Sequence, residues 1–206
     1  VSWSANTTLT LSAYRNVDGT LGLINPSGGA GNVILRADNT GTGPGAAAGT
    51  VILGAANVTL DTGTATVYYN PASYAALTDY GVSGFITGGT TISQALVFVN
   101  NTSATAQSRA YDGTTTATLS GPFAFLTGPD GVTAGQIVSL SAGTADFNSK
   151  DVATATTVNF AGYGLAGGNS TSYSLFSQPE SQLANITTAA LSITGAAAQN
   201  KIYDST

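Results

Sequence analysis

Short runs of apolar and β-branched residues follow one another along the chain, and turn-forming residues separate them. In the first third these runs are residues 8–13, 21–25, 33–37, 50–53, 58–61 and 66–69. Gly, Asn, Asp and Pro fill the gaps between them, and apolar positions at helical spacing are absent from this third. The pattern predicts β-strands.

The spacing of these runs favours one arrangement of the strands. The first three begin at Leu9, Leu21 and Val33, which are 12 residues apart. Short strands this close together form either a meander or the successive sides of a parallel β-helix. The composition favours the helix, because a solenoid buries small and β-branched residues in each rung and tolerates uncharged Thr, Asn and Gly outside. We therefore predict the terminal coils of a β-helix in residues 1–66.

Aromatic residues concentrate in residues 67–94 and interrupt the strand pattern. Pro71 prevents a ladder hydrogen bond at its position. The terminal rung of a solenoid exposes an apolar end, and large aromatic side chains are able to cover it. We interpret this segment as a junction or cap. Its aromatic residues include Tyr68, Tyr69, Tyr74, Tyr80 and Phe85.

From residue 95 the spacing lengthens and the alternation of apolar and polar positions becomes cleaner. Such alternation is typical of antiparallel strands with one buried face. Seven strands in about 100 residues is the count of an immunoglobulin-like β-sandwich, so residues 95–194 are predicted to form one. The expected strands are residues 95–99, 115–120, 137–142, 152–161, 173–176, 181–186 and 190–194.

An internal repeat supports this division. Arg-Ala-Tyr-Asp-Gly-Thr at residues 109–114 recurs as Lys-Ile-Tyr-Asp-Ser-Thr at residues 201–206, with the two tyrosines 92 residues apart. The apolar run at residues 95–99 likewise resembles residues 190–194. A period of this length fits one sandwich per repeat. Residues 195–206 are therefore expected to begin a further repeat of a tandem array.

The amino-acid composition excludes several classes of function. The 206 residues include 5 Lys and Arg, 10 Asp and Glu, and no Cys, His or Met, and the net charge is −5. Without thiolate, imidazole or thioether groups, most enzyme mechanisms and the usual zinc sites are excluded, so we expect no enzyme, cofactor or metal. Five scattered cations do not neutralise a run of phosphates, so nucleic acid is not an expected partner. The chain contains no stretch of 18 or more apolar residues, so no membrane-spanning helix is predicted.

Several segments in the second half, taken together, resemble a known repeat. They are Tyr-Asp-Gly-Thr at residues 111–114 with the strand that follows, the apolar run at 138–140, Asp-Phe at 146–147, the run at 158–160 and Gly-Tyr-Gly-Leu-Ala-Gly at 162–167. In that order they resemble the YDG-type repeat of large bacterial exoproteins, over residues 95–206. Residues 35–43, 49–51 and 67–71 resemble the last coils and the junction of the same proteins. Ser205 departs from the motif, which has Gly there.

The resemblance implies an architecture and a location. Exoproteins similar to filamentous haemagglutinin are exported by two-partner secretion and are built on a right-handed parallel β-helix. An all-β chain with the end of such a helix followed by an immunoglobulin-like YDG sandwich is therefore implied, on a bacterial cell surface or secreted from it. Its function would be adhesive or structural, possible binding partners being surface glycans or matrix. Biofilm formation and cell adhesion are the expected contexts.

Two function classes compete with this expectation. A carbohydrate-active β-helix enzyme needs paired carboxylates, of which Asp146 and Asp151 are the closest pair, or a basic cluster, for which Arg15 and Arg36 are the only cations in the first part. An ice-binding module needs threonines in register on successive rungs. Thr-Ala-Thr at residues 64–66 has the right local pattern, but the sequence alone does not show the register.

The Tyr-Asp motif is interpreted as structural, because Asp-Gly supports a turn and a tyrosine ring packs while its hydroxyl bonds to backbone. Its residues are Tyr111, Asp112, Gly113 and Thr114, with Tyr203 and Asp204 in the second copy. Lys150 and Lys201 are candidates for an isopeptide crosslink, which requires a buried lysine beside an asparagine and a carboxylate.

Six Asn-x-Ser/Thr sequons occur, as a chain rich in Asn and Thr produces by chance, and the adhesins that the chain resembles carry sugars at such sites. The possible glycosylation sites are Asn6, Asn57, Asn100, Asn101, Asn169 and Asn185. Self-association is also expected, because uncharged strand edges pair readily. We expect residues 201–206 of one copy to meet residues 80–98 of the next, giving fibres.

Overall fold

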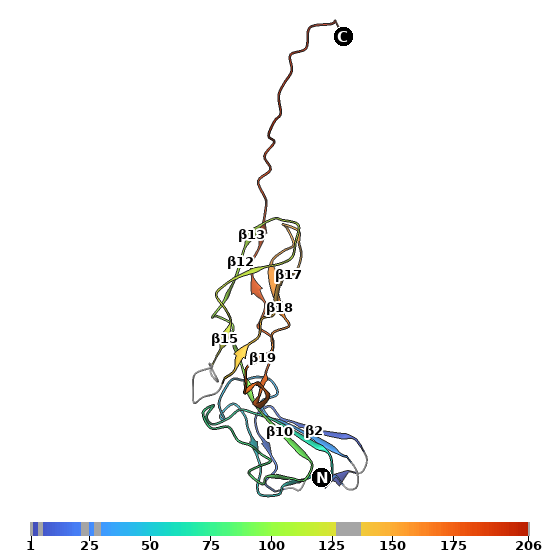
Figure 1. Ribbon diagram of the computed structural model, residues 1–206, viewed down its shortest axis with the longest axis vertical. Helices are drawn as coiled ribbons and strands as arrows, with labels where there is room; N and C mark the ends of the chain where they lie inside the picture. Colours follow the sequence, from blue (N-terminus) through green and yellow to red (C-terminus); the bar gives the residue numbers. More distant parts are fainter. Residues whose placement is uncertain (1, 4–5, 22–24, 27–29, 127–136, 206) are drawn as a thin grey trace.

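The computed structural model describes residues 2–3, 6–21, 25–26, 30–126 and 137–205. Within these ranges the chain is all-β, and its one helical element is the 3-10 turn η2 (Ser170–Ser172). None of the described residues form a helix that is long and apolar enough to cross a membrane. Three parts follow one another along the molecule (Figure 1). We call them the coil stack (residues 2–97), the second lobe (residues 98–187) and the tail (residues 188–205).

Parallel strands in register build the main side of the coil stack. Each strand pairs with the strand one coil later in the chain, at offsets of 24, 32 and 26 residues. Parallel pairing needs a long connection between partners, and here each connection runs around the rest of the coil. The four strands are β2 (Thr8–Ser12), β5 (Asn32–Arg36), β8 (Thr64–Tyr69) and β10 (Thr90–Val97).

Shorter parallel pairs form the other sides of the coils. Each joins an element to the one that follows it a coil later. The pairs are β1 (Ser2–Trp3) with β4 (Asn25–Pro26), β3 (Val17–Asp18) with β6 (Val51–Ile52), and β7 (Val58–Thr59) with β9 (Ile86–Thr87).

Buried and outward-facing side chains alternate along the strands of the coil stack. Val33 and Leu35 of β5 and Ala65 and Val67 of β8 are fully buried, and the residues between them face outwards. Each buried Val or Leu contributes roughly 1.5–3 kcal/mol relative to an exposed one. The register places Val33 over Ala65 and Leu35 over Val67, so these aliphatic side chains fill the interior between the two strands.

One corner of the coils requires glycine. A Cβ on Gly63 would collide with the carbonyl oxygen of Gly31, and one on Gly89 would collide with the carbonyl oxygen of Gly63. Gly89 also has a φ of +56°, in the left-handed region. Three successive coils therefore approach so closely at this corner that no side chain fits between them.

A buried polar pair extends the register beyond the strands. Asp38 follows β5 and Asn70 follows β8, and both are fully buried. The Asn70 amide donates to Asp38 Oδ2 at 2.9 Å, and the backbone N–H and hydroxyl of Thr42 donate to Asp38 Oδ1 at 2.7 and 2.8 Å. These bonds satisfy the carboxylate and fix the loop that leaves β5.

Tyrosines from residues 67–94 pack against the core of the last coils. Tyr69 and Tyr80 are buried with ring centroids 5.1 Å apart, edge to face. The Tyr80 hydroxyl donates to the Val51 carbonyl at 2.8 Å, and the Tyr74 hydroxyl donates to the Leu96 carbonyl at 2.6 Å. Burial raises the pKa of Tyr80 to about 12 and raises those of Tyr69 and Tyr74 as well. The segment thus closes the side of the core.

The second lobe consists of short, mainly antiparallel pairs around a core of its own, which includes Phe123, Phe147, Val158 and Phe160. β17 (Thr144–Phe147), β18 (Thr157–Ala161) and β21 (Gln182–Leu183) form its three-stranded sheet. Its two-stranded pairs are β11 (Val99–Asn100) with β15 (Ala124–Phe125), β12 (Thr105–Gln107) with β14 (Thr118–Ser120), β16 (Ser139–Leu140) with β19 (Leu165–Ala166), and the parallel pair β13 (Arg109–Ala110) with β22 (Ile186–Thr187).

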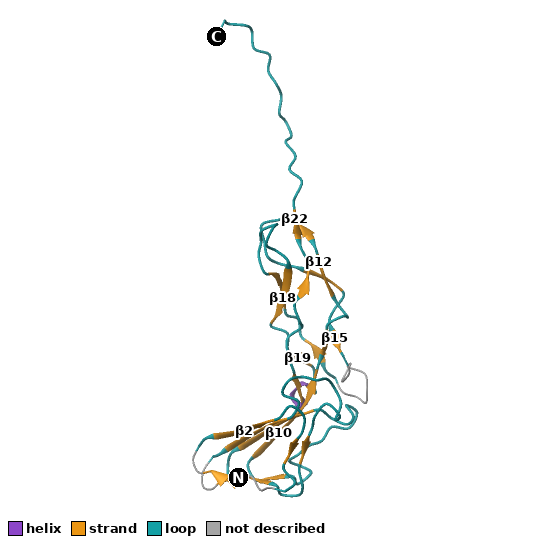
Figure 2. Ribbon diagram, turned by 180° about the vertical axis from the view of Figure 1, so that it is seen from behind, coloured by secondary structure: helices purple, strands orange, loops and turns teal. Residues whose placement is uncertain are grey.

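The second lobe is joined to the coil stack by a shared sheet. β20 (Tyr173–Leu175), a strand of the second lobe, pairs in parallel with Ala95–Val97 of β10 and so becomes the fifth strand of the stack's main sheet. Leu175 contacts both hydrophobic cores. Figure 2 shows the second lobe rising from the side of the coil stack at which β10 lies.

The boundaries differ from those expected. The predicted end of the first part at residue 66 lies inside β8, and parallel pairing continues to Val97 because β10 follows the same register. Residues 190–194 form no strand in the structure, and they are fully exposed. Their apolar residues have no partner within the second lobe, whose last strand is β22. The expected strand at residues 21–25 falls mostly outside the described residues.

Two buried tyrosines give a matched test of this packing. Tyr80→Phe removes the hydrogen bond to Val51 and is expected to lower the free energy of unfolding by about 1 kcal/mol. The buried hydroxyl of Tyr173 has no hydrogen-bond partner among the described residues. Tyr173→Phe therefore removes an unsatisfied group and is expected to leave the stability unchanged or to raise it. Urea unfolding of both variants measures the difference, and an equal loss in the two would contradict this packing.

Candidate functional site

The Tyr-Asp motif forms a tight turn after β13. The backbone N–H and the hydroxyl of Thr114 both donate to Asp112 Oδ1 at 2.9 Å. Gly113 has a φ of +84°, which a residue with a side chain adopts at a cost. The bonds from Thr114, and then the Arg109 guanidinium, hold the pKa of Asp112 below its usual value. The structural interpretation of this Asp-Gly turn agrees with the observed geometry.

Arg109 organises the residues around the turn. It forms an ion pair with Asp112, and its guanidinium donates to the carbonyls of Thr114 at 2.7 Å and Thr116 at 3.1 Å. The same guanidinium lies 5.4 Å from the ring centroid of Phe147, over its face. One side chain therefore ties β13, the turn and β17 together. The sequence reasoning did not single out Arg109, although the repeat has a cation at this position in both copies.

Tyr111 does not behave as expected. Its backbone N–H donates to the Thr187 carbonyl at 2.9 Å, which extends the pairing of β13 with β22. Its ring is 41% exposed, and its hydroxyl makes no hydrogen bond in the described part of the chain. The ring is thus available at the surface instead of packed in a core, because the strand ends there and the turn directs the side chain outwards.

The second copy of the motif lies in the tail. Lys201 pairs with Asp204 at 3.0 Å, the counterpart of the Arg109–Asp112 pair. Tyr203 is 87% exposed. The structure does not bring the two copies of the motif together (Figure 1).

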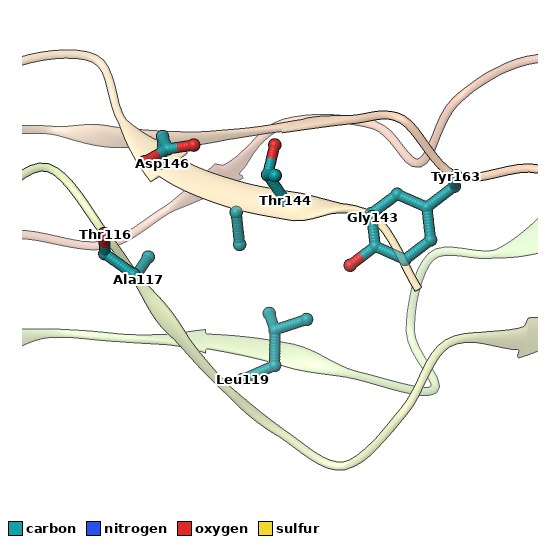
Figure 3. A pocket seen from close by; sticks show the side chains of 8 residues that line it. Thr116, Ala117, Leu119, Gly143, Thr144, Asp146 and Tyr163 are labelled. Carbon is teal, nitrogen blue, oxygen red and sulfur yellow. The ribbon is translucent and has the colours of Figure 1, made fainter. Parts of the chain in front are cut away.

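A pocket of about 400 Å³ opens beside the motif in the second lobe, between β14 and β17. The segment that leads into β14 pairs with β17 at the Thr116–Asp146 bridge. Figure 3 shows Leu119 and Ala117 on one side of the opening and the Tyr163 ring at its end. Asp146 is the one acidic residue of the pocket lining, and its Oδ1 accepts the Thr115 hydroxyl at 3.2 Å. The lining offers no second carboxylate for acid–base chemistry.

Asp151 lies instead in the turn between β17 and β18. Its backbone carbonyl accepts the Ala155 N–H at 2.9 Å, and its side chain pairs with Lys150 at 3.5 Å in solvent. Lys150 and Lys201 are both more than half exposed, so neither has the buried environment that an isopeptide crosslink requires. The described residues contain no group of three or more acidic side chains placed to hold a metal ion.

The sequon asparagines differ in how far the fold already uses them. Asn57 is buried and accepts the Gly54 N–H, and Asn101 accepts the Glu180 N–H at 2.9 Å. Asn185 is exposed, and its side chain forms no hydrogen bond within the described ranges. The others, Asn6, Asn100 and Asn169, accept backbone N–H groups with their side chains.

The outer face of the coil stack places threonines, isoleucines and one asparagine in shared rows, here called the threonine rows, which the sequence alone did not reveal. Thr10, Ile34, Thr66 and Ile92 lie opposite one another on four neighbouring strands. A second row contains Thr8 and Asn32, and Thr64 and Thr90. A third row ends the open part of the face, because Arg36 lies between the rings of Tyr68 and Phe176, 5.4 and 5.5 Å from their centroids.

Comparison with known families identifies part of this architecture. Residues 93–182 match the YDG domain. The chain carries a YDG domain. The match begins within β10 and ends in β21, so it covers the shared strand, the Tyr-Asp turn and the pocket. It confirms the YDG resemblance over this range. Neither a curated protein nor a solved structure matches the chain.

The Asp112 carboxylate gives a test of the turn by pH. Because the folded-state pKa of Asp112 lies below its unfolded value, its contribution to stability is fully present above about pH 4 and is lost as the pH falls through the folded pKa. Acid unfolding of the wild type and of Asp112→Asn should show a stability difference at pH 6 that shrinks towards pH 2. A difference that stays constant over this range would contradict the assigned role of the carboxylate.

Proposed function

We propose that the chain is a structural and adhesive segment of a large secreted bacterial surface protein, similar to filamentous haemagglutinin and exported by two-partner secretion. In this proposal residues 2–97 are the last coils of a right-handed parallel β-helix, and the second lobe is an immunoglobulin-like sandwich of the YDG type. The parallel register through four coils supports the first assignment. The two cores and the YDG match support the division.

The observation that carries the proposal is the unbroken β-pairing from the coil stack into the YDG domain. β10 pairs with β8 on one side and with β20 on the other. Parallel hydrogen bonds across this boundary resist bending better than a flexible linker does. The two ends of the chain lie at opposite ends of an elongated molecule (Figure 1), as a segment that extends away from a cell requires.

The surface chemistry determines which contacts suit such a segment. Charged residues make up 7% of the chain, against about 25% in ordinary domains. Adhesion through Thr, Ser and Asn hydroxyl and amide groups depends little on ionic strength, because screening acts on charges. Neutral glycans and uncharged abiotic surfaces are the partner classes that fit.

Beads coated with the chain provide the test. They are expected to bind a neutral glycan array or a polystyrene surface several-fold more than beads coated with the heat-unfolded chain, and to remain bound in 1 M salt. Binding no stronger than that of the unfolded control on every surface would contradict adhesion. Binding that disappears in salt would contradict the uncharged mode.

A second candidate function, ice binding, is supported by the threonine rows of the coil stack. Neighbouring strands lie about 4.7–4.9 Å apart, so side chains in register form a regular array. The open rows carry hydroxyl and methyl groups and no charged side chain, and Thr10 and Ile92 are exposed. A regular, uncharged array of this kind is suited to ordering water on its surface.

Ice recrystallisation assays test this second function. The chain is expected to slow recrystallisation, and Thr66→Tyr, which places a bulky ring in the middle of the rows, should remove more than half of the effect. Thr118→Tyr, an exposed change on the second lobe, is the matched control and should have no effect. Unhindered recrystallisation with the wild type, or equal effects of both variants, would exclude this function.

A further inference from the structure

The repeat in the tail extends further upstream than its Tyr-Asp motif. When the 92-residue offset is continued, residues 196–206 align with residues 104–114 without a gap, and 6 of the 11 positions are identical. The shared pattern is Ala-x-Ala-Gln-x-(Arg or Lys)-x-Tyr-Asp-x-Thr. In the second lobe the corresponding segment forms β12, β13 and the turn.

Burial accounts for two of the identical positions. Ala104 and Ala106 are buried in the core of the second lobe, with exposures of 1% and 6%, and the tail has Ala196 and Ala198 in their places. Most of the positions that differ are exposed in the second lobe, Thr105 among them. The tail therefore preserves both alanines that the core requires, and the other identical positions are Gln199 and residues of the Tyr-Asp turn.

The tail also preserves the conformation of the turn. Ser205 has a φ of +63°, close to the +84° of Gly113, although serine rarely adopts this region. Its neighbour Asp204 is paired with Lys201, as Asp112 is with Arg109. The local geometry is present even though no other part of the described chain packs on it.

Large apolar side chains of the tail lack a covering. Residues 188–205 are all exposed. In the second lobe, the equivalent segment is covered by strands that follow it in the sequence: β14 pairs with β12, and the Gln182 amide bonds to Ala106 and Ala104. A half-unit like residues 115–187 would therefore be a complementary cover for the tail. The exposed apolar residues are Leu191, Ile193, Ile202 and Tyr203, at 81–92% exposure.

The first strands of the two copies are joined to what precedes them in the same way. β10 begins the YDG domain and pairs in parallel with β8 of the coil stack. β22 lies 92 residues after Gln94 and Ala95 of β10, and it pairs in parallel with β13 of the second lobe. In both cases the strand that starts a unit is an additional strand of the preceding one.

We propose that residues 186–205 are the first strands of a second YDG unit, which fold when a half-unit equivalent to residues 115–187 packs on them, and that successive units share parallel β-pairs in place of linkers. The partner is thus a second YDG half-unit. This inference does not depend on adhesion or ice binding, and its test uses neither readout.

The surface where we expected the tail of a neighbouring copy to bind is partly occupied. Tyr80 and Phe98 are buried, Ala95 pairs with β8 on one edge and with β20 on the other, and Leu96 and Val97 pair with β20. Residues 115–187 of each copy are likewise engaged with their own β12 and β13. A second copy of this chain therefore offers no complementary half-unit without unfolding.

Amide hydrogen exchange tests the proposal on two proteins, the chain of 206 residues and the same chain followed by a second copy of residues 115–187. In the unextended chain, residues 196–203 should exchange at the rate of an unfolded peptide. In the extended chain they should be slowed at least about 100-fold, as amides in a folded unit are. Fast exchange of these residues in the extended chain, with the coil stack and the second lobe still protected, would overturn the proposal.

Two substitutions in the extended chain identify the cause of the protection. Ala196→Asp places a charge at a core position and should restore fast exchange. Ala197→Asp, at the position equivalent to exposed Thr105, should leave the protection intact. Equal effects of the two would overturn the proposal. So would concentration-dependent protection of the tail in the unextended chain, because another surface would then receive it.

Discussion

The structure depends on one strand that has partners on both sides. β10 pairs in parallel register with β8 of the coil stack on one side and with β20 of the second lobe on the other. Hydrogen bonds of buried parallel strands are costly to break, because the freed N–H and C=O groups find no water. The shared strand therefore makes the orientation of the second lobe a consequence of the register that begins at β2.

The packing around this strand strengthens the connection. Tyr74 donates to the Leu96 carbonyl and stacks on Tyr173, with ring centroids 6.5 Å apart. Phe98, which follows β10, and Phe176, which follows β20, also stack, with ring centroids 5.3 Å apart. Aromatic pairs of this kind contribute about 0.5–1.5 kcal/mol each beyond their burial. The paired rings come from segments far apart in the sequence. They therefore connect the coil stack to the second lobe through side chains, in addition to the backbone pairing of β10 with β20.

Much of the architecture could be predicted from residue pattern. The apolar runs at residues 33–37 and 66–69 predicted strands, which the structure has at Asn32–Arg36 and Thr64–Tyr69. The tyrosines of residues 67–94 predicted a covering segment. The register could not be predicted, since coils of 24, 32 and 26 residues have no fixed period. Without the register, neither the threonine rows nor the Asp38–Asn70 pair could be found from the sequence.

At the candidate site, too, local features could be predicted from the sequence, and contacts between distant residues could not. The Tyr-Asp turn could be predicted because Asp-Gly acts locally. The role of Arg109 was missed because its partners Thr116 and Phe147 are brought to it by the fold. The strand expected at residues 190–194 was assigned from apolar alternation alone. Alternation marks a segment that is able to pair, but a strand forms where a partner is present.

Thermal unfolding followed residue by residue tests the shared strand most directly. Amide NMR signals of Val67 in the coil stack and of Val158 in the second lobe report on the two cores, which Leu175 contacts together. If β10 couples the two parts, both signals disappear in a single transition, and Leu175→Asp lowers its midpoint for both. Two separate transitions, or a Leu175→Asp effect confined to one core, would contradict the account.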